Sequence, residues 1–466
     1  MVSAFAAQSG VASFRGQVWE GDVSDRSSAA SGIATMTPLY RNYVLFILFL
    51  SYTVNIVDRA ILSLLLEPIK AEFALSDTEL GLLGGFAFAI AYSVLGLPLG
   101  AWADRWIRKN VLAICIAGWS VATALCGTAI GFKTLILARV GTASGEAGCS
   151  PAAHSLIADY FKLEKRATAL SFFALGIPAG TFLGNLIGGF GNDAFGWRWT
   201  FVLGGAPGVL VALLVWFTVK EPRRGLSDDK PHNTDEPAPT ISETIRFLAR
   251  KRAFVHLTLA AAMHSVAWYS GSVWNAPFLQ RSHDLSSSQT GSILGTVALI
   301  AALGTFFGGV LSDRLSKWRN DRRWYMWLPG IGCVLMIPFQ FLSYLGGDLA
   351  YVVPSFAVML VLGSLFFGPS FAITQGLAAP RMRAIAASIL LFMQTIIGLT
   401  VGPWLVGLAS DYLMPSLGID SLRWSLVFVQ LWNIWAAAHY WFGAKHLRQE
   451  LEATESLAEA AQTPGR

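Results

Sequence analysis

The sequence predicts an all-α membrane protein whose twelve transmembrane helices form two pseudo-symmetric six-helix bundles. Hydrophobic residues make up 54% of the 466 residues and charged residues 14%, whereas soluble globular chains carry about 25% charge. Apolar runs of about 20 residues, long enough to cross a bilayer, recur along the chain between short basic loops. These features indicate a multi-pass membrane protein without a large soluble domain.

Residues 1–40 are rich in Ser, Ala and Gly and contain no continuous apolar region followed by a cleavage site. They predict a disordered cytoplasmic tail and not a signal peptide. Residues 41–220 form the predicted N-terminal bundle, with spans near 43–66, 80–103, 110–130, 134–158, 168–190 and 198–219.

Residues 221–252 form a predicted cytoplasmic linker. Thr240 and Glu243 have the spacing of a capping box and open a short helix with apolar and basic residues, which indicates an interfacial helix. Residues 253–446 form the predicted C-terminal bundle, and residues 447–466 a cytoplasmic tail. The spans of the second bundle are expected near 254–279, 290–312, 325–345, 351–376, 384–409 and 424–445.

Basic residues set the predicted orientation. Alternating loops place about 27 of the 34 Lys and Arg residues on one side, which is the cytoplasmic side by the positive-inside rule. Both termini are therefore expected in the cytoplasm of a bacterial inner membrane or plasma membrane protein. Because the basic residues are dispersed over several loops, nucleic acid is not an expected partner.

The two halves repeat each other. Corresponding positions are separated by 209, 217, 218 and 225 residues and keep their order. The pairs are Gly100–Arg105 with Gly309–Arg314, Arg166 with Arg383, Asp193 with Asp411, and Trp197–Trp199 with Leu422–Trp424. Duplicated halves place a substrate site between them, near the middle of the bilayer.

The loop after the second span resembles a motif of the major facilitator superfamily, because Gly100, Ala103, Asp104 and Arg105 match its pattern, as do Arg108 and Lys109. The resemblance implies the fold of that superfamily. Acids and bases at helix ends can latch neighbouring helices, so we expect a cytoplasmic gate. Its predicted members are Asp104, Arg105, Arg108, Asp313, Arg314, Arg166 and Arg383.

Further motifs lie in the first, second, fourth and fifth spans and beside them: Asn55–Arg59, Gly81–Gly84, Arg139–Ala147, Pro151, Ile157–Phe161, Lys165–Arg166 and Ile177–Gly180. These motifs resemble the Spinster subfamily, whose animal members move lysolipids and sphingolipid phosphates. The resemblance implies a lipid-like substrate.

The first and fourth spans carry four charged residues inside apolar segments. At 1.5 Å per residue, Asp58 and Arg59 lie roughly 22 Å from the cytoplasmic edge and Arg139 reaches a similar height, so Asp58 and Arg139 can pair. Glu146 lies two turns from Arg139 on the same face. Charges inside a bilayer are costly, so we expect these four residues to serve transport.

Two acids and two bases sum to zero charge when all are ionised. Protonation of either acid leaves a positive site that favours an anion. We therefore predict Asp58 and Glu146 as proton-coupling residues and Arg59 and Arg139 as ligands of a phosphate or carboxylate. The alternative is that the quartet only holds the two spans together.

Other polar and aromatic residues of the spans are weaker candidates for substrate binding. They are Ser51, Asn55, His264, Trp268, Tyr269, and the amides Gln375 and Gln394, which we expect to be buried. Packing or interhelical hydrogen bonds explain them equally well. Glycines 176, 180, 184 and 188 lie along one side of the fifth span and predict a close helix contact.

Together these features predict a proton-coupled secondary transporter of an anionic amphipathic substrate, such as a lysolipid or a sphingolipid phosphate. The alternatives are a carrier of a small organic or sugar-phosphate anion, a pump for amphipathic drugs, and a membrane receptor that transports nothing. No enzyme motif, cofactor motif or metal-ligand spacing is present, so we expect no enzyme, cofactor or metal. We expect a monomer among membrane lipids, because each chain contains both repeats.

Overall fold

The computed structural model describes residues 37–223, 226 and 239–462. Three parts of the chain lie outside the described residues: residues 1–36 of the predicted N-terminal tail, residues 224–225 and 227–238 of the predicted linker, and residues 463–466. Regular structure in the described part of the chain is helical throughout, which confirms the all-α fold class.

We call residues 37–223 the first half and residues 239–462 the second half. The elements of the first half are α2 (Pro38–Phe73), α3 (Asp77–Gly81), η1 (Leu82–Phe86), α4 (Ala87–Arg105), α5 (Arg108–Cys126), α6 (Phe132–Glu146), α7 (Cys149–Tyr160), α8 (Leu163–Ala174) and α9 (Gly176–Thr218).

The second half opens with α10, where Thr240 and Glu243 cap each other as the sequence predicts. Its elements are α10 (Ile241–Ala249), α11 (Arg252–His283), α12 (Ser287–Arg319), α13 (Trp324–Leu345), α14 (Leu349–Ser364), α15 (Phe367–Leu377), η2 (Pro380–Met382), α16 (Arg383–Met393), η3 (Gln394–Leu399), α17 (Thr400–Leu417), η4 (Gly418–Asp420), α18 (Ser421–Gln430) and α19 (Trp432–Gln462).

Eight stretches of the described helices are long and apolar enough to cross a bilayer. The predicted count of twelve spans stays a prediction, because several predicted spans are divided or joined in the structure. The predicted span 134–158 is divided between α6 and α7, and α9 carries two predicted spans. Within α9 the chain turns at Gly196, whose φ of 77° is a conformation that glycine adopts readily.

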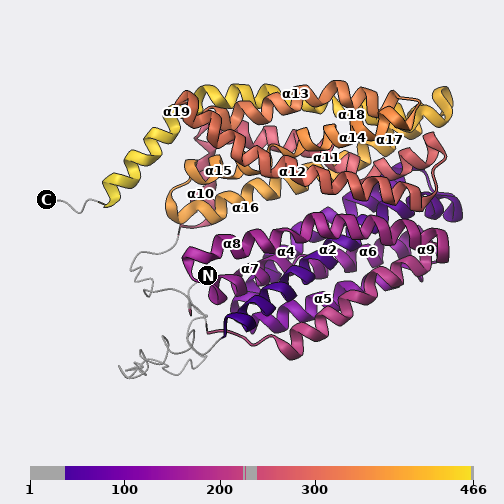
Figure 1. Ribbon diagram of the computed structural model, residues 1–466, viewed down its shortest axis with the longest axis horizontal. Coiled ribbons are helices and arrows are strands. Elements are labelled where there is room, and N and C mark those ends of the chain that lie inside the picture. The colour runs from indigo at the N-terminus through magenta and orange to yellow at the C-terminus, as the bar shows by residue number, and fades with distance from the viewer. Residues whose placement is uncertain (1–36, 224–225, 227–238, 463–466) are drawn as a thin grey trace, which may run out of the picture.

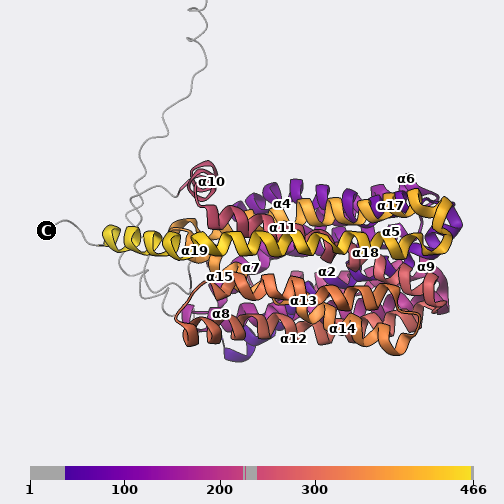
Figure 2. The ribbon, with the colours of Figure 1, turned by 90° about the horizontal axis from the view of Figure 1, so that it is seen from above.

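The two halves lie side by side with their long helices along the longest axis of the molecule (Figure 1). α2 begins and α19 ends toward the left in Figure 1, where α19 projects beyond the bundle, as Figure 2 also shows. We call this the terminal end and the opposite one the far end.

A stripe of glycines sets the contact between α2 and α9. A Cβ atom added at Gly180 would lie 2.5 Å from the Thr53 carbonyl oxygen, and one at Gly184 would lie 2.7 Å from the Ala60 Cβ. Gly176 and Gly188 meet α2 in the same way. The predicted close contact is confirmed, and it fixes the position of α2, which carries Asp58 and Arg59.

The hydrophobic core differs between the two ends. The largest cluster joins both halves and includes Leu65 and Leu80 of the first half with Phe278 and Leu422 of the second. Two further clusters each lie within one half. One contains Val44 and Val219 of the first half, and the other contains Leu248 and Leu451 of the second half. The halves therefore share a core toward the far end and keep separate cores toward the terminal end.

Aspartates from one half cap helices of the other half at the far end. Asp411 of α17 accepts hydrogen bonds from the backbone N–H groups of Asp77 (2.9 Å) and Thr78 (2.7 Å), at the start of α3. Asp193 of α9 accepts from the N–H groups of Ser287 (3.2 Å) and Ser288 (2.8 Å), at the start of α12. The repeated Asp193 and Asp411 thus make equivalent contacts across the two halves.

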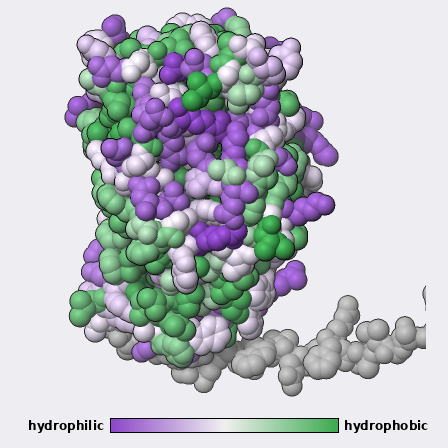
Figure 3. All heavy atoms as spheres, turned by 90° about the vertical axis from the view of Figure 1, so that its right-hand side faces the viewer, coloured by the Kyte–Doolittle hydropathy of each residue, from purple (hydrophilic) through white to green (hydrophobic). Residues whose placement is uncertain are grey.

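An ion-pair network reinforces one of these two seams. The buried Asp77 carboxylate accepts from Arg281 through two hydrogen bonds of 2.7 Å, from Lys70, and from Ser410 at 2.6 Å. Arg281 also pairs with Glu67. Figure 3 shows the far end, where hydrophilic side chains gather between hydrophobic flanks. These contacts hold the far end closed.

Removing a cross-half cap should loosen the far end. An Asp411→Ala or Asp193→Ala substitution leaves backbone N–H groups without their acceptor, so we expect a loss of about 1 kcal/mol of stability per cap. Hydrogen exchange measured by mass spectrometry should become faster at Thr78 or Ser288, respectively, and across the helix start of the opposite half.

The matched control is Asp348→Ala, because Asp348 caps α14 of its own half by accepting from the Ala350 N–H. This variant should speed exchange only around Ala350. Unchanged exchange at Thr78 in Asp411→Ala would contradict the capping role of Asp411.

Candidate functional site

Four charged side chains from α2 and α6 form two ion pairs inside the first half. Arg139 Nη1 donates to Asp58 Oδ2 at 2.8 Å, and Arg59 Nε donates to Glu146 Oε2 at 2.6 Å. The predicted pairing of Asp58 with Arg139 is confirmed. We call the four residues the quartet.

Three members of the quartet are sealed, and one is accessible. The side chains of Asp58 and Arg139 are each 2% exposed and that of Glu146 is 0% exposed, whereas the Arg59 side chain is 31% exposed. Thr123 of α5 also donates to Asp58, at 2.6 Å. Arg59 is therefore the member that a molecule from outside the first half can reach.

Several buried polar atoms at the quartet have no partner among the described residues. They are Asn55 Nδ2, Arg139 Nε and Glu146 Oε1. Buried polar atoms in native proteins are satisfied in the great majority of cases, by protein or by ordered water. The carboxylates of Asp58 and Glu146 also lie within electrostatic range of each other. The site can therefore accept a proton or form further hydrogen bonds with water or an anion.

Two aromatic side chains of α4 that the sequence analysis did not single out lie beside Arg59. Its Cζ lies 4.9 Å from the ring centroid of Phe88 and 4.8 Å from that of Tyr92, both on α4. Tyr269 of α11 packs on the same cluster from the second half. The spacing of Phe88 and Tyr92, four residues apart on one helix, was the signal available in the sequence.

Three other polar candidates, Ser51 of α2, Gln375 of α15 and Gln394 of η3, have different surroundings. Ser51 is buried and donates to the carbonyl oxygen of Ile47 in its own helix, at 2.8 Å. Gln394 is buried, and its Nε2 has no acceptor among the described residues. Gln375 is exposed. The expectation that Gln375 is buried was wrong, because its side chain on α15 is exposed.

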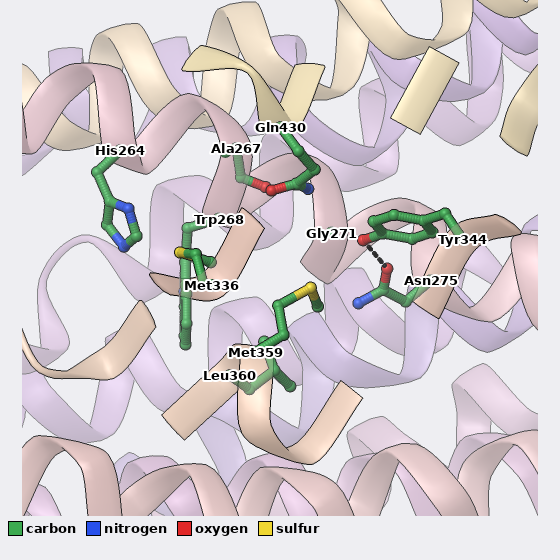
Figure 4. A pocket seen from close by; sticks show the side chains of 10 residues that line it. All are labelled: His264, Ala267, Trp268, Gly271, Asn275, Met336, Tyr344, Met359, Leu360 and Gln430. Atoms are coloured by element: carbon green, nitrogen blue, oxygen red, sulfur yellow. Dashed lines mark hydrogen bonds between the residues drawn. The ribbon is translucent and has the colours of Figure 1, made fainter. Parts of the chain in front are cut away.

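His264 lies in a separate polar cluster of the second half. Its Nδ1 is 2.7 Å from Asn433 Oδ1 and its Nε2 is 2.9 Å from the Gly363 carbonyl oxygen. Figure 4 shows His264 and Trp268 beside a small cavity of about 10 Å³, the space of about one water molecule. Nearby, Tyr344 donates to Asn275 Oδ1 at 2.9 Å. The structure does not bring His264 to the quartet.

The predicted gate residues lie toward the terminal end, where their described contacts join elements of the same half. Arg108 donates to Asp159 of α7 and, through Nε, to Glu221 at 2.7 Å. Arg166 donates to the Ala158 carbonyl oxygen at 2.8 Å, and Asp313 accepts from the Tyr325 hydroxyl at 2.6 Å.

The other predicted gate residues are described only in part. Arg105, Arg314 and Arg383 are exposed. The Asp104 side chain lies outside the described part of the structure. The contacts described for these residues therefore include no latch between the two halves.

Comparisons with known proteins agree with the fold. The family model described as Major Facilitator Superfamily matches residues 48–435. An MFS-type efflux pump of Mycolicibacterium smegmatis is 33% identical over 411 residues, which cover 87% of this chain and 93% of that protein. The sphingosine-1-phosphate transporter SPNS2 of Danio rerio is 28% identical, with 79% and 76% of the two chains covered.

A crystal structure of a bacterial homologue of the human lysosomal transporter Spinster, inward-facing and unoccupied, is similar over 89% of this chain and 99% of that chain. The TM-score is 0.82 and the sequence identity is 32%.

The Asp58 carboxylate should be essential to the stability of the first half. An Asp58→Asn substitution leaves the Arg139 guanidinium buried without its carboxylate, and removing one partner of a buried pair costs about 3 to 5 kcal/mol. Denaturant unfolding of the purified protein in detergent measures this loss.

The double variant Asp58→Asn/Arg139→Gln should regain part of the lost stability, because it removes the uncompensated charge. Glu452→Gln, which breaks the exposed pair with Arg448 on α19, should change stability little. If Asp58→Asn were as stable as the wild type, the buried Arg139 guanidinium would not need the Asp58 carboxylate to compensate its charge.

Proposed function

The chain belongs to the major facilitator superfamily, and we propose that it is a proton-coupled secondary transporter that moves an anionic amphipathic substrate across the membrane by alternating access. The observation that carries this proposal is the quartet, in which two acids and two bases are paired and only Arg59 is accessible. Membership in this family and the apolar helices identify an integral multi-pass membrane protein and a transporter, not an enzyme.

Proton coupling follows from the charge balance of the quartet. With all four side chains ionised, the net charge is zero and each acid neutralises a base. Protonation of Glu146 or Asp58 releases one guanidinium from its carboxylate and leaves a net charge of +1. An anion then binds to the site, and deprotonation restores the internal pair and expels the anion.

The surroundings of Glu146 support its role as a titrating group. Its carboxylate is faced by Arg59 and Arg139 as bases and by Asp58 as a second acid. Cys149 of α7 also lies within electrostatic range of it. The Arg59 pair is the one that borders accessible space, so exchange of a proton for an anion is simplest there.

Alternating access is supported by the difference between the two ends. The far end is closed by cross-half caps and a shared core, whereas each half has its own core at the terminal end. With both termini in the cytoplasm, as the basic loops predict, this arrangement is open inward. In the opposite state, Asp104, Arg105, Arg108, Asp313, Arg314, Arg166 and Arg383 would form the cytoplasmic gate.

The residues that the second half places near Arg59 support the proposal of an amphipathic substrate. Near Arg59, the second half contributes Tyr269 and Leu399 to the apolar cluster that contains Phe88. Gln394, with its unpartnered amide, is the polar candidate there. A polar head at Arg59 and an apolar tail along the second half would fit this asymmetry. The printed substrate of the Danio rerio relative, sphingosine-1-phosphate, has this chemistry.

Efflux of amphipathic drugs is the second candidate function. It is favoured by the 33% identity to the Mycolicibacterium smegmatis efflux pump. A pump for cationic or neutral drugs would not need the accessible Arg59.

We expect a single chain to work as a monomer, because it contains both halves.

Anion binding should weaken as the pH rises, because deprotonation of the quartet restores the internal ion pairs. A Glu146→Gln substitution leaves the quartet permanently at +1, so binding should stay strong and lose its pH dependence. Uptake of palmitoyl lysophosphatidate into proteoliposomes, measured with and without a pH gradient, tests this expectation.

Glu164→Gln on α8 is the control, because Glu164 is exposed and remains outside the quartet. It should keep the pH dependence of the wild type. If Glu146→Gln transports with the wild-type pH dependence, Glu146 takes no part in coupling.

Substrate selection separates a lipid carrier from a small-anion carrier. In competition experiments, palmitoyl lysophosphatidate should inhibit uptake at roughly a hundredfold lower concentration than a hexose phosphate, since each buried methylene contributes about 0.8 kcal/mol. Equal inhibition by the two compounds would favour the small-anion alternative, and inhibition only by a cationic drug would favour efflux.

A further inference from the structure

Phe88 and Tyr92 form a continuous aromatic surface on α4. They are one helical turn apart, their ring centroids are 5.9 Å apart and their planes differ by 17°. Phe88 is 2% exposed. We call this pair of rings the aromatic platform. It begins two residues after the π-helical turn η1, and such turns change which face of a helix the following residues occupy.

Both arginines of the quartet lie over the platform. Arg59 lies over both rings, with its Cζ at 4.9 and 4.8 Å from the two centroids, and Arg139 lies over Phe88 at 5.3 Å. The negative face of an aromatic ring attracts a cation, and the attraction is strongest when the pair is desolvated. Phe88 therefore supports two neighbouring guanidinium groups that would otherwise repel each other.

The platform also determines which part of each guanidinium is available. A guanidinium donates hydrogen bonds only in its plane, from its edges. The Cζ of Arg59 lies over both rings, and its Nε donates to Glu146. The terminal nitrogens Nη1 and Nη2 of Arg59 have no described acceptor, and the side chain is 31% exposed. Arg139 differs, because it is 2% exposed and donates to Asp58 through Nη1.

We propose that Phe88 and Tyr92 are positioning residues that hold Arg59 with its two terminal nitrogens toward the substrate, so that Arg59 alone contacts the anion and Arg139 acts only by its charge. This inference rests on the proposed function and assigns the two arginines different roles. The ligand it predicts is a group with two oxygen atoms side by side, a phosphate or a carboxylate, that meets Nη1 and Nη2 in one plane.

The neighbours from the second half support this assignment. Tyr269 of α11 and Leu399 of η3 pack on the cluster that contains Phe88, together with Tyr92. Tyr269 also interacts with Thr395 of η3. The platform thus lies at the boundary between the halves, so movement of the second half changes access to Arg59 and leaves the pair of Asp58 with Arg139 inside the first half.

Removal of one ring tests the inference. Tyr92→Leu removes the ring under Arg59 without touching the pair of Asp58 with Arg139, whereas Tyr92→Phe keeps the ring. We measure uptake of palmitoyl lysophosphatidate and of palmitate into proteoliposomes over a range of concentrations and pH. Tyr92→Leu should raise KM about tenfold for both anions, with kcat and the pH profile close to those of the wild type.

Tyr92→Phe should restore KM toward the wild-type value, because the phenyl ring still supports the guanidinium. Phe217→Leu is the control, since Phe217 is exposed near the end of α9 and far from α4 in the sequence. Phe88→Leu should have the larger effect and should also alter the pH profile, because it removes support from both arginines. An unchanged KM in Tyr92→Leu, or a KM in Tyr92→Phe as high as that of Tyr92→Leu, would overturn the inference.

A crystal structure of the Tyr92→Leu variant separates this inference from the proposed function. We expect the Arg59 guanidinium to leave the plane it occupies in the wild type, and a guanidinium that stays in place would overturn the positioning role even without any substrate. Absence of uptake by the wild-type protein would overturn the proposed function instead. Uptake of only one of the two anions would identify phosphate or carboxylate as the group bound.

Discussion

Charge neutrality inside the bilayer is the constraint on which this structure depends. Arg139, sealed within the first half, needs the carboxylate of Asp58, and the sealed Glu146 needs the guanidinium of Arg59. Both pairs join α2 to α6, so their geometry depends on the position of α2. That position is set on the other side by the glycine stripe of α9, which lets the two backbones approach closely. Packing and electrostatics therefore act on the same helix.

The internal duplication explains how the far end closes. Asp193 and Asp411 are separated by 218 residues, and so are Gly189 and Gly407, one turn before them. In both seams the glycine meets the backbone of the opposite helix start, and the aspartate caps it. One seam adds the buried ion pairs of Asp77, and no such pair is among the described contacts of the other seam. The duplicated halves thus share one closing device, and only one copy carries additional charge.

Much of the site could be predicted from the sequence because helix geometry is regular. A fixed rise per residue places Asp58 and Arg139 at one height, and the structure pairs them. Local patterns likewise predicted the all-α fold class, the capping box of α10 and the contact of α2 with α9. These features depend on residues close in sequence or on a strict repeat.

Other features depend on contacts that no local pattern specifies. The exposure of Gln375 depends on the rotation of α15 against its neighbours. The place of Phe88 beside two arginines depends on the turn η1. The repeat of Asp193 and Asp411 was visible, yet their partners lie in the opposite half. The predicted span 134–158 is divided between α6 and α7, and its apolar run did not specify this break.

The central claim is that an anion and a proton bind together at the quartet. Calorimetric titration of palmitoyl lysophosphatidate, carried out at one pH in buffers of different ionisation enthalpy, counts the protons taken up with the anion. The account predicts an uptake of about one proton per anion when the quartet is fully ionised before binding. A binding enthalpy that is the same in every buffer over the whole pH range would contradict it.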